Sequence, residues 1–247
     1  MTQPIVTVAI PSLNQGQFLE AALQSVFSQN TSMEVFVLDG GSTDNSLDII
    51  KKWSPRLSGW RSRRDDGQAS AINEGISMGS APFVCWLNSD DWFTPGGLTT
   101  LVNTLSVSHQ FPAAYGRTWS MNQKTGKRRA VWVEPFDEER LATRCIISQP
   151  GTIIRREAWN SLRGLNEDLH MAMDYDLWWR LYKEFGELYF VNDYVAFNRE
   201  HDRTKTRNLR ALHYKEAIDV VRKHHGRVPL KWWLAQPYAV WFRSIFS

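Results

Sequence analysis

The chain is poor in the features that define several large classes of protein. It contains two cysteines, Cys85 and Cys145, and no apolar run that reaches the roughly 18 residues of a membrane-spanning helix. Two cysteines without paired spacing argue against a disulfide framework and against a cysteine-ligated zinc site. The N-terminus has no basic stretch followed by an apolar one, which argues against a signal peptide. Together these absences predict a cytoplasmic protein.

A strong charge of either sign is also lacking. The formal net charge is +3 over 247 residues, so the overall charge gives no indication of nucleic acid as a partner. The basic clusters at 61–64 and 124–129 are interpreted as solvated surface. With 43% hydrophobic and 22% charged residues, the composition is that of a globular protein able to bury a core.

Aromatic residues, by contrast, are abundant, with 12 tryptophans in the chain. Residues 231–246 read KWWLAQPYAVWFRSIF and combine aromatic with basic side chains, a composition that suits a lipid headgroup interface. We therefore expect a peripheral contact with the inner face of the cell membrane through this segment. Two alternatives stay open: a C-terminal helix packed on its own domain, or one packed on a second subunit of a homodimer.

Hydrophobic periodicity predicts strands alternating with helices over the first half of the chain. The predicted strands are 5–10, 33–38, 57–61 and 83–87, and the predicted helices are 18–28, 46–53 and 68–78. In the second half we expect helices at 95–105, 175–185 and 209–224, strands within 115–133 joined by a turn at 123–126, and a strand at 151–155. This order predicts an α/β fold with a Rossmann-like, mostly parallel sheet flanked by helices, followed by a C-terminal helical tail.

Polar loops follow three of the predicted strands, at 11–14, 39–44 and 88–91. Ligands of open α/β sheets bind at the carboxyl ends of the strands, so we expect these loops to converge on one binding site. Asp39, at the end of the second strand, suits recognition of a base or ribose because a carboxylate accepts two hydrogen bonds from neighbouring donors. The alternative for Asp39 is a turn residue ahead of two glycines.

Asp90 and Asp91 are adjacent carboxylates at the end of an apolar run, PFVCWLNSDDW. Two carboxylates held together repel each other unless a cation lies between them. Mg²⁺ and Mn²⁺ prefer oxygen ligands and commonly combine one or two carboxylates with substrate phosphates. The pair therefore predicts a divalent metal bound together with a diphosphate. The alternative, an N-cap for the helix that begins near Pro95, explains one acid but not both.

Five motifs occur in order along the chain: PSLNQGQFLEAALQSVFSQ, VLDGGSTDNS, DDGQASAINEG, WLNSDDW and MDYDLWWRL. Together they resemble the family-2 glycosyltransferases, which are nucleotide-sugar-dependent enzymes with the glycosyltransferase-A fold. The resemblance extends from about Ile5 to His201 and so covers most of the chain. It implies a single catalytic domain at 1–210, with a nucleotide-binding half at about 1–105 and an acceptor half at about 106–210, and a separate tail at 211–247.

The resemblance implies a nucleotide-sugar donor, most often a UDP-sugar, and a glycan or lipid-linked glycan acceptor in cell-surface polysaccharide synthesis. It also implies residues for the nucleotide pocket, each at a matching motif position: Pro11, Ser12, Asn14, Asp39, Ser42, Asp65, Gln68, Asn73, Asn88 and Ser89. Asp90 matches the metal-binding acid of the D-x-D motif, with Asp91 as a neighbour or second ligand. Mn²⁺ or Mg²⁺ is the expected cofactor.

Catalysis is assigned by the resemblance to the segment MAMDYDLWWR. Asp174 matches the second acid of the family's E-D pair and is implied as the general base, with Asp176 as the competing candidate. A base that takes the proton of the acceptor hydroxyl, opposite the leaving diphosphate, implies inversion at the anomeric carbon. The chain departs from the family at two positions: Asn88 replaces the first acid of D-x-D, and Met173 replaces the first acid of E-D.

Four further residues are implied more weakly. His201 lies in a segment that, in similar proteins, reaches the diphosphate or the metal. Arg199 and Lys205 are expected to assist with phosphate charge, and Gln149 to line the acceptor site. His224 and His225 are interpreted as surface residues at a helix end.

The Q-x-x-R-W motif of processive polysaccharide synthases is missing, which favours an enzyme that adds one sugar or a few. Two other functions stay open. Because Asn88 and Met173 depart from the family, the chain could be a non-catalytic nucleotide-sugar or glycan-binding module with a degenerate site. A nucleotidyltransferase also needs an acid pair and Mg²⁺, but it usually has a glycine-rich phosphate loop that PSLNQGQ does not provide.

Overall fold

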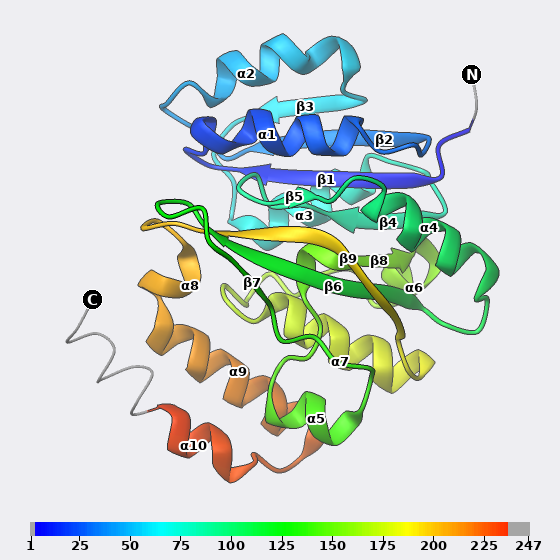
Figure 1. Cartoon of the computed structure of the whole chain (residues 1–247), viewed down its shortest axis with the longest axis vertical. Helices are drawn as coiled ribbons and strands as arrows, with labels where there is room; N and C mark the ends of the chain where they lie inside the picture. The colour runs from blue at the N-terminus through cyan, green and yellow to red at the C-terminus, as the bar shows by residue number, and fades with distance from the viewer. Residues whose placement is uncertain (1–2, 237–247) are drawn as a thin grey trace.

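A computed structural model describes residues 3–236, which fold around a nine-stranded sheet (Figure 1). The strand order is β3-β2-β1-β4-β8-β6-β9-β5, with β7 paired to β6. The first part of this sheet is parallel. It consists of β1 (Val6–Ser12), β2 (Met33–Asp39), β3 (Gly59–Ser62) and β4 (Phe83–Trp86). The predicted alternation of strands and helices in this half is confirmed by α1 (Gly16–Phe27), α2 (Ser46–Trp53) and α3 (Gln68–Ser77).

Helices cover both faces of the parallel strands because successive side chains of a strand point to opposite faces. In β1, Val8 and Ile10 join a hydrophobic cluster with α1, α2 and α4 (Gly97–Val107). Ala9, between them, joins a second cluster with α3 on the opposite face. Strands buried on both faces read as continuous apolar runs, which explains the sequences VTVAI and FVCWL.

The second half of the chain extends the sheet with mostly antiparallel pairs. The strands are β5 (Trp92–Phe93), β6 (Ala113–Asn122), β7 (Arg128–Ala130), β8 (Thr152–Arg155) and β9 (Tyr189–Glu200). β8 lies antiparallel between β4 and β6, whereas β9 runs parallel to β6. The short helices α5 (Glu138–Thr143) and α6 (Arg156–Ser161) connect these strands, and a 3-10 turn, η2 (Gln149–Gly151), leads into β8.

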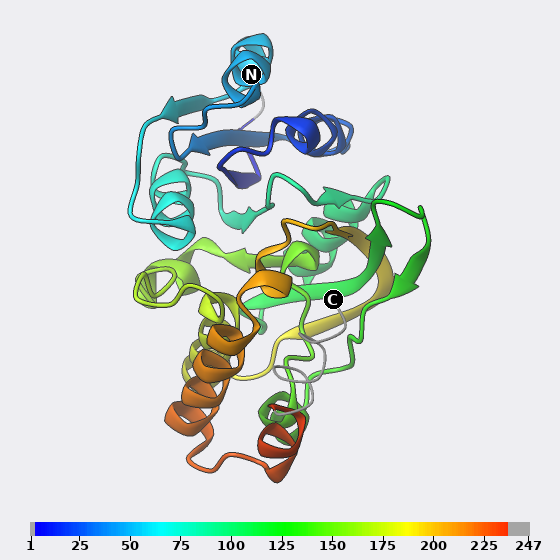
Figure 2. The same ribbon diagram turned by 90° about the vertical axis from the view of Figure 1, so that its left-hand side faces the viewer.

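Three helices pack beneath the second half of the sheet (Figure 2). They are α7 (Met173–Phe185), α9 (Arg210–His225) and α10 (Leu230–Gln236), with a short helix, α8 (Lys205–Asn208), ahead of α9. Val220 and Val221 of α9 belong to the same hydrophobic cluster as Leu177 and Trp178 of α7. α9, which the sequence analysis assigns to a separate tail, therefore shares a hydrophobic core with α7, and the domain boundary at residue 210 stays a prediction.

The C-terminal segment bears on two of the alternatives left open by its composition. Trp232 of α10 is buried against Tyr175 and Tyr214, and its indole donates to the Ala142 carbonyl at 2.8 Å. This part of the helix packs on its own domain, as one alternative predicted. Leu230 and Leu234 are nevertheless each 69% exposed. Residues 237–246, the rest of the predicted membrane segment, lie outside the described residues.

β9 is the largest element that the sequence did not predict. Its twelve residues are interrupted by Asn192 and Asp193, which are exposed where the β6–β9 register shifts. A bulge of this kind breaks the alternation that identifies a strand. Over residues 3–236 the structure contains no helix long and apolar enough to cross a membrane.

Candidate active site

A cavity of about 1330 Å³ opens at the carboxyl ends of β1 and β4 and continues between the strand β9 and the helix α7. Single-ligand sites usually occupy about 300–1,000 Å³, so this cavity has room for two substrates. Thirteen predicted site residues line it: Pro11, Ser12, Asp65, Gln68, Asn88, Ser89, Asp90, Asp91, Gln149, Asp174, Arg199, His201 and Lys205. Gly40 of the second predicted loop lines it as well, so the predicted convergence of the three polar loops on one cavity is confirmed.

The wall nearest β1 and α3 offers hydrogen-bonding groups for a polar ligand. Ser12 is 5% exposed and lines the cavity, and its hydroxyl has no hydrogen-bond partner among the described residues. Buried hydroxyls are rarely left unpaired, so this one is suited to meet a ligand atom. Asp65 forms an ion pair with Arg61 at 2.9 Å and accepts from the Gly67 amide, which fixes the loop ahead of α3.

Asn88 connects both halves of the cavity. Its carbonyl oxygen accepts from Gln68 Nε2 at 2.7 Å, and its amide nitrogen donates to Gln149 Oε1 at 3.1 Å and Asp91 Oδ2 at 3.2 Å. Gln149 in turn donates to the Trp86 carbonyl at 2.8 Å. A carboxylate at position 88 has no hydrogen to donate, so the amide is what satisfies both Gln149 and Asp91. The departure from D-x-D therefore has a structural reason.

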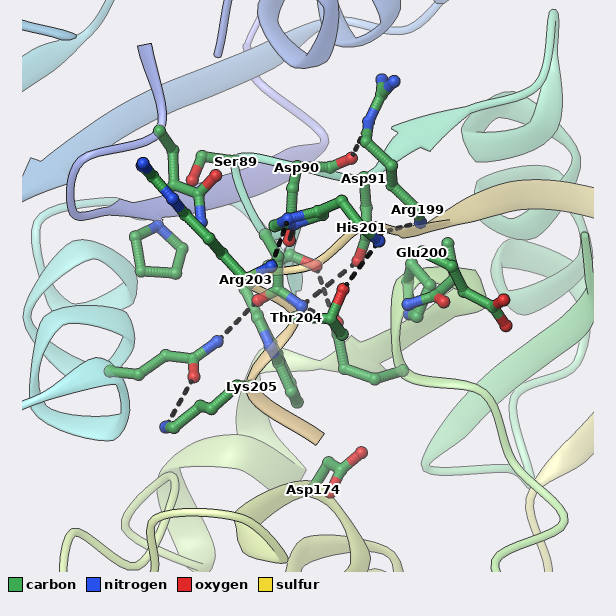
Figure 3. Close-up of a pocket in the computed structure, with 18 of the residues that line it drawn as sticks. Ser89, Asp90, Asp91, Asp174, Arg199, Glu200, His201, Arg203, Thr204 and Lys205 are labelled. Carbon is green, nitrogen blue, oxygen red and sulfur yellow. Dashed lines mark hydrogen bonds and ion pairs between the residues drawn. The ribbon is translucent and has the colours of Figure 1, made fainter. Parts of the chain in front are cut away.

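Asp90 and His201 meet in the cavity, as Figure 3 shows. Asp90 Oδ2 and His201 Nε2 are 3.0 Å apart, although the residues come from the loop after β4 and from the end of β9. His201 also packs on the Phe18 ring, with 4.7 Å between ring centroids. His201 thus lies beside the predicted metal-binding acid, while its role toward a metal or diphosphate stays a prediction.

Asp91 is turned into the protein more than Asp90 is. Its side chain is 2% exposed; one carboxylate oxygen accepts from the Arg199 backbone amide at 3.0 Å and the other from Asn88. Burial and the neighbouring charge of Asp90 hold the pKa of Asp91 well above its usual range. Arg199 donates from Nε to the Asp90 carbonyl at 2.8 Å, so it braces this turn.

Asp174 occupies the first turn of α7 and points into the cavity from the side opposite Asp90 (Figure 3). Desolvation raises the pKa of Asp174 to about 6, and the hydrogen bond from the Tyr175 amide and the charge of Lys205 partly oppose this shift. A carboxyl that titrates near the working pH suits a general base. Cys145 also lines the cavity near this acid, and burial raises the pKa of its thiol.

Asp176, the competing candidate for the base, does not line this cavity. It is 1% exposed and is paired with Arg180 at 2.6 Å and with His224 at 2.9 Å. Despite the opposing effect of burial, these partners lower the pKa of Asp176 to about 2. The structure therefore favours Asp174 over Asp176 as the base, because the Asp176 carboxylate is occupied by Arg180 and His224 and does not line the cavity. His224, predicted at the surface, is instead stacked on Trp179.

Four residues predicted for the nucleotide pocket do not line the cavity: Asn14, Asp39, Ser42 and Asn73. The loops that carry Asn14 and Ser42 are bonded to each other, since Ser42 Oγ accepts from the backbone amide of Asn14 at 2.7 Å. Asn73 bonds to Leu165 on both sides of its amide group. The structure gives Asn14, Ser42 and Asn73 hydrogen bonds that hold loops together, and their contact with a nucleotide stays a prediction.

Asp39 is fully buried, and its carboxylate accepts from the Gly41 and Ser42 amides and from the Ser42 and Ser62 hydroxyls. It therefore contributes no unoccupied oxygen to the cavity surface. Base recognition by Asp39 stays a prediction that requires this loop to rearrange when a ligand binds.

Two residues that support or line the cavity, Glu216 and Arg203, belong to none of the five motifs. Glu216 on α9 is 8% exposed and accepts from three consecutive backbone amides, those of His170 at 3.1 Å, Met171 at 2.7 Å and Ala172 at 2.9 Å. It thereby fixes the segment that leads into α7 and Asp174. The sequence signal that could have identified Glu216 was an acid on the apolar face of a predicted helix. Arg203, on the segment that carries His201, also lines the cavity.

Asp90 and His201 are the side chains best suited to hold a divalent ion. Within residues 3–236 there is no group of three or more His, Cys, Asp or Glu side chains arranged to bind a metal. A carboxylate and an imidazole that already converge can still bind one, because Mg²⁺-type ions usually complete their coordination with substrate phosphates and water. The donor set thus fits an ion shared with a diphosphate rather than one held by the protein alone.

This sheet with an acid-lined cavity at its carboxyl edge is that of the glycosyltransferase-A fold. *Staphylococcus aureus* TarS, solved with UDP-GlcNAc, superimposes with a TM-score of 0.73 over 96% of this chain and 73% of that one, at 16% identity. The mannosyltransferase PcManGT from *Pyrobaculum calidifontis*, solved with GDP-Man and Mn²⁺, gives a TM-score of 0.72 over 97% of this chain and 73% of that one, at 19% identity.

The chain belongs to glycosyl transferase family 2, whose model matches residues 7–161. It is 28% identical over 214 residues to the chondroitin synthase of *Pasteurella multocida*, an alignment that spans 83% of this chain but 22% of that protein. It is also 28% identical over 182 residues to a PGL/p-HBAD biosynthesis glycosyltransferase of *Mycobacterium bovis*, covering 71% of this chain and 69% of that protein. The chain therefore spans only part of the length of these relatives.

Proposed function

We propose that the chain transfers a sugar from a nucleoside-diphosphate sugar to a hydroxyl of a glycan or lipid-linked glycan acceptor, with inversion at the anomeric carbon. The observation that carries this proposal is that side chains suited to bind a metal and a carboxylate suited to act as a base line opposite sides of one cavity. Asp90 and His201 line one side, and Asp174, with its raised pKa, faces them from α7. A UDP-sugar is the proposed donor, since it is the commonest in the family.

The residues divide into a donor side and an acceptor side. Ser12, Asp65 and Gln68 surround the proposed nucleotide position, and their groups suit ribose and base atoms. Asn88 anchors Gln68 and so fixes that wall. On the other side Asp174 takes the proton of the acceptor hydroxyl as its oxygen attacks the anomeric carbon. Attack from that side, opposite the leaving diphosphate, inverts the anomeric centre.

Asp90 and His201 would hold the divalent ion, either Mn²⁺ or Mg²⁺, which when bound offsets the charge that develops on the leaving diphosphate. Arg199 keeps the Asp90 turn in place through its bond to the Asp90 carbonyl. Asp91 stabilises the same turn. Its two carboxylate oxygens accept hydrogen bonds from the Arg199 backbone amide and from the Asn88 side chain.

The test is a panel of UDP-, GDP- and TDP-sugars with Mn²⁺, followed by release of the nucleoside diphosphate. We expect slow donor hydrolysis that Asp90→Ala abolishes and that the surface variant Asp168→Asn leaves unchanged. Transfer to an acceptor should also be lost in Asp174→Asn, and the anomeric coupling constant of the product should report inversion. Thermal stabilisation by a donor without any turnover would instead indicate a binding module. Pyrophosphate release from a nucleoside triphosphate and a sugar phosphate would indicate a nucleotidyltransferase.

We further propose that the enzyme adds one sugar or a few and acts in cell-surface polysaccharide synthesis. Product length under acceptor excess tests the first point, because a processive enzyme would yield long products beside unused acceptor. Exposed Leu230, Trp233 and Leu234, next to Lys231, support a peripheral contact with an anionic membrane surface. Flotation with phosphatidylglycerol vesicles tests this contact, and dimerisation through the same face would replace it.

A further inference from the structure

Two basic side chains, Arg210 and Lys205, line the cavity without forming an ion pair with any carboxylate of residues 3–236. Arg210, the first residue of α9, lines the cavity, and its Nη1 is shielded from solvent with no hydrogen-bond partner among the described residues. No carboxylate of the described chain forms an ion pair with it. A shielded guanidinium N–H without an acceptor is costly, so this group is suited to meet an anion from outside the chain.

Lys205 adds a second cation to the lining of the same cavity. Its ammonium donates to two neutral oxygens, the His170 carbonyl at 2.6 Å and Gln68 Oε1 at 3.2 Å. Its charge reaches Asp174, the proposed base. In Figure 3, Lys205 lies toward Asp174 and away from Asp90. This cation is therefore associated with the acceptor end as well as with the donor wall.

The charge of Glu216 acts on Lys205, but this acid forms no ion pair with either cation among the described residues. Glu216 has one oxygen bonded to the His170 amide and the other to the amides of Met171 and Ala172. His213, one turn after Arg210, likewise has a shielded Nδ1 without a hydrogen-bond partner among the described residues. Residues three apart on a helix share a face, so His213 and Arg210 lie on the same side of α9.

We propose that Arg210 and Lys205 form a binding subsite for an anionic group, a carboxylate or a phosphate, on the acceptor molecule. The inference rests on the proposed function, because it names the chemical class of acceptor used by that site. An acid on the acceptor would otherwise meet the like charge of Asp174, which lines the cavity. Lys205, whose charge acts on Asp174, and Arg210, which lines the same cavity, would offset that repulsion and orient the hydroxyl toward the base.

The donor diphosphate is a poorer match for Arg210. That diphosphate is expected at Asp90 and His201, where the metal would bridge it, whereas Arg210 belongs to α9. This helix is held against the loop before α7 by the bonds of Glu216. Arg203, on the same segment as His201, is better placed for the diphosphate.

The experiment titrates three probes into the full chain by calorimetry: methyl β-glucuronide, glucose 6-phosphate and the neutral methyl β-glucoside. The titrations are carried out with and without saturating UDP and Mn²⁺, which block the diphosphate position. We expect at least one anionic probe to bind about tenfold more tightly than the neutral one, the effect of one charge-assisted hydrogen bond. The tighter of the two anions then identifies the source of the charge.

Arg210→Gln should remove this preference, while Lys215→Gln, which removes an equal charge from an exposed position of α9, should retain it. Equal binding of the charged and neutral probes would overturn the inference, as would a preference that persists in Arg210→Gln. Donor hydrolysis is measured on the same proteins. Hydrolysis without an anion preference would refute the acceptor class alone, whereas absent hydrolysis on every donor would refute the proposed function.

Discussion

The ionisation of Asp174 should set the acid limb of the pH–rate profile. Its pKa is raised from the ordinary value of 3.8 to about 6 because the carboxyl is desolvated at the start of α7. A general base works only when ionised, so activity is lost as the pH falls through this value. With a pKa of about 6, the ionised fraction falls from about 90% at pH 7 to about 10% at pH 5. We therefore expect kcat/KM to decline about tenfold over this interval.

The assay follows nucleoside diphosphate release between pH 4.5 and 8, with both substrates below their KM values, so that the profile reports the free enzyme. An unshifted carboxyl would remain ionised at pH 5 and give a nearly flat profile. Lys205→Gln provides a directional test: because the Lys205 charge lowers the pKa of Asp174, its removal should move the acid limb to higher pH. Lys215→Gln serves as the control. A flat profile down to pH 5, or an acid limb that moves downward in Lys205→Gln, would refute the assignment.

Two further predictions concern the supports of the base. Glu216→Gln replaces an acceptor of three buried amides with a group that offers a single acceptor oxygen, so we expect a loss of about 2 kcal/mol in the free energy of unfolding. Glu216→Gln should also lower kcat more than it changes the donor KM. The control Glu157→Gln, at an exposed acid on α6, should change neither value. An unaltered kcat in Glu216→Gln would exclude the positioning role. Asp176→Asn breaks the buried pairs with Arg180 and His224 and should cost about 3 kcal/mol in a denaturant titration, yet leave turnover intact at low temperature. Because the folded-state pKa of Asp176 is depressed to about 2, its contribution is present above the ordinary pKa of 3.8 and is lost as the pH falls toward 2. Loss of turnover in a folded Asp176→Asn protein would make Asp176 the base.

The sequence predicted the site best where chemistry and strand position coincide. Asp90 follows a buried apolar run, so its place at the carboxyl edge of the sheet followed from the alternation of strands and helices. Asp174 was found through its motif rather than through any pattern of spacing. Only the structure distinguishes the role of Asp174 from that of Asp176, two residues away. The two side chains leave the first turn of α7 in different directions, and only Asp174 lines the cavity.

The failures have a common physical origin in long-range partners. His224 was interpreted as a solvated helix end because its partner, Asp176, is 48 residues away in the chain. Asn14 and Ser42 bond to each other across 28 residues, so nothing local indicates that they do not line the cavity. β9 was missed because Asn192 and Asp193 interrupt its pattern, although its pairing with β6 accommodates them as a bulge.

The hydrogen bonds of Asn88 constrain how this sequence can evolve. A reversion to aspartate at position 88 would set a carboxylate against the oxygens of Gln149 and Asp91, at 3.1 Å and 3.2 Å from the present amide nitrogen. That single change would be penalised unless position 149 or 91 changed with it. Descendants of this chain are therefore expected to keep the amide, or to change position 88 together with position 149 or 91.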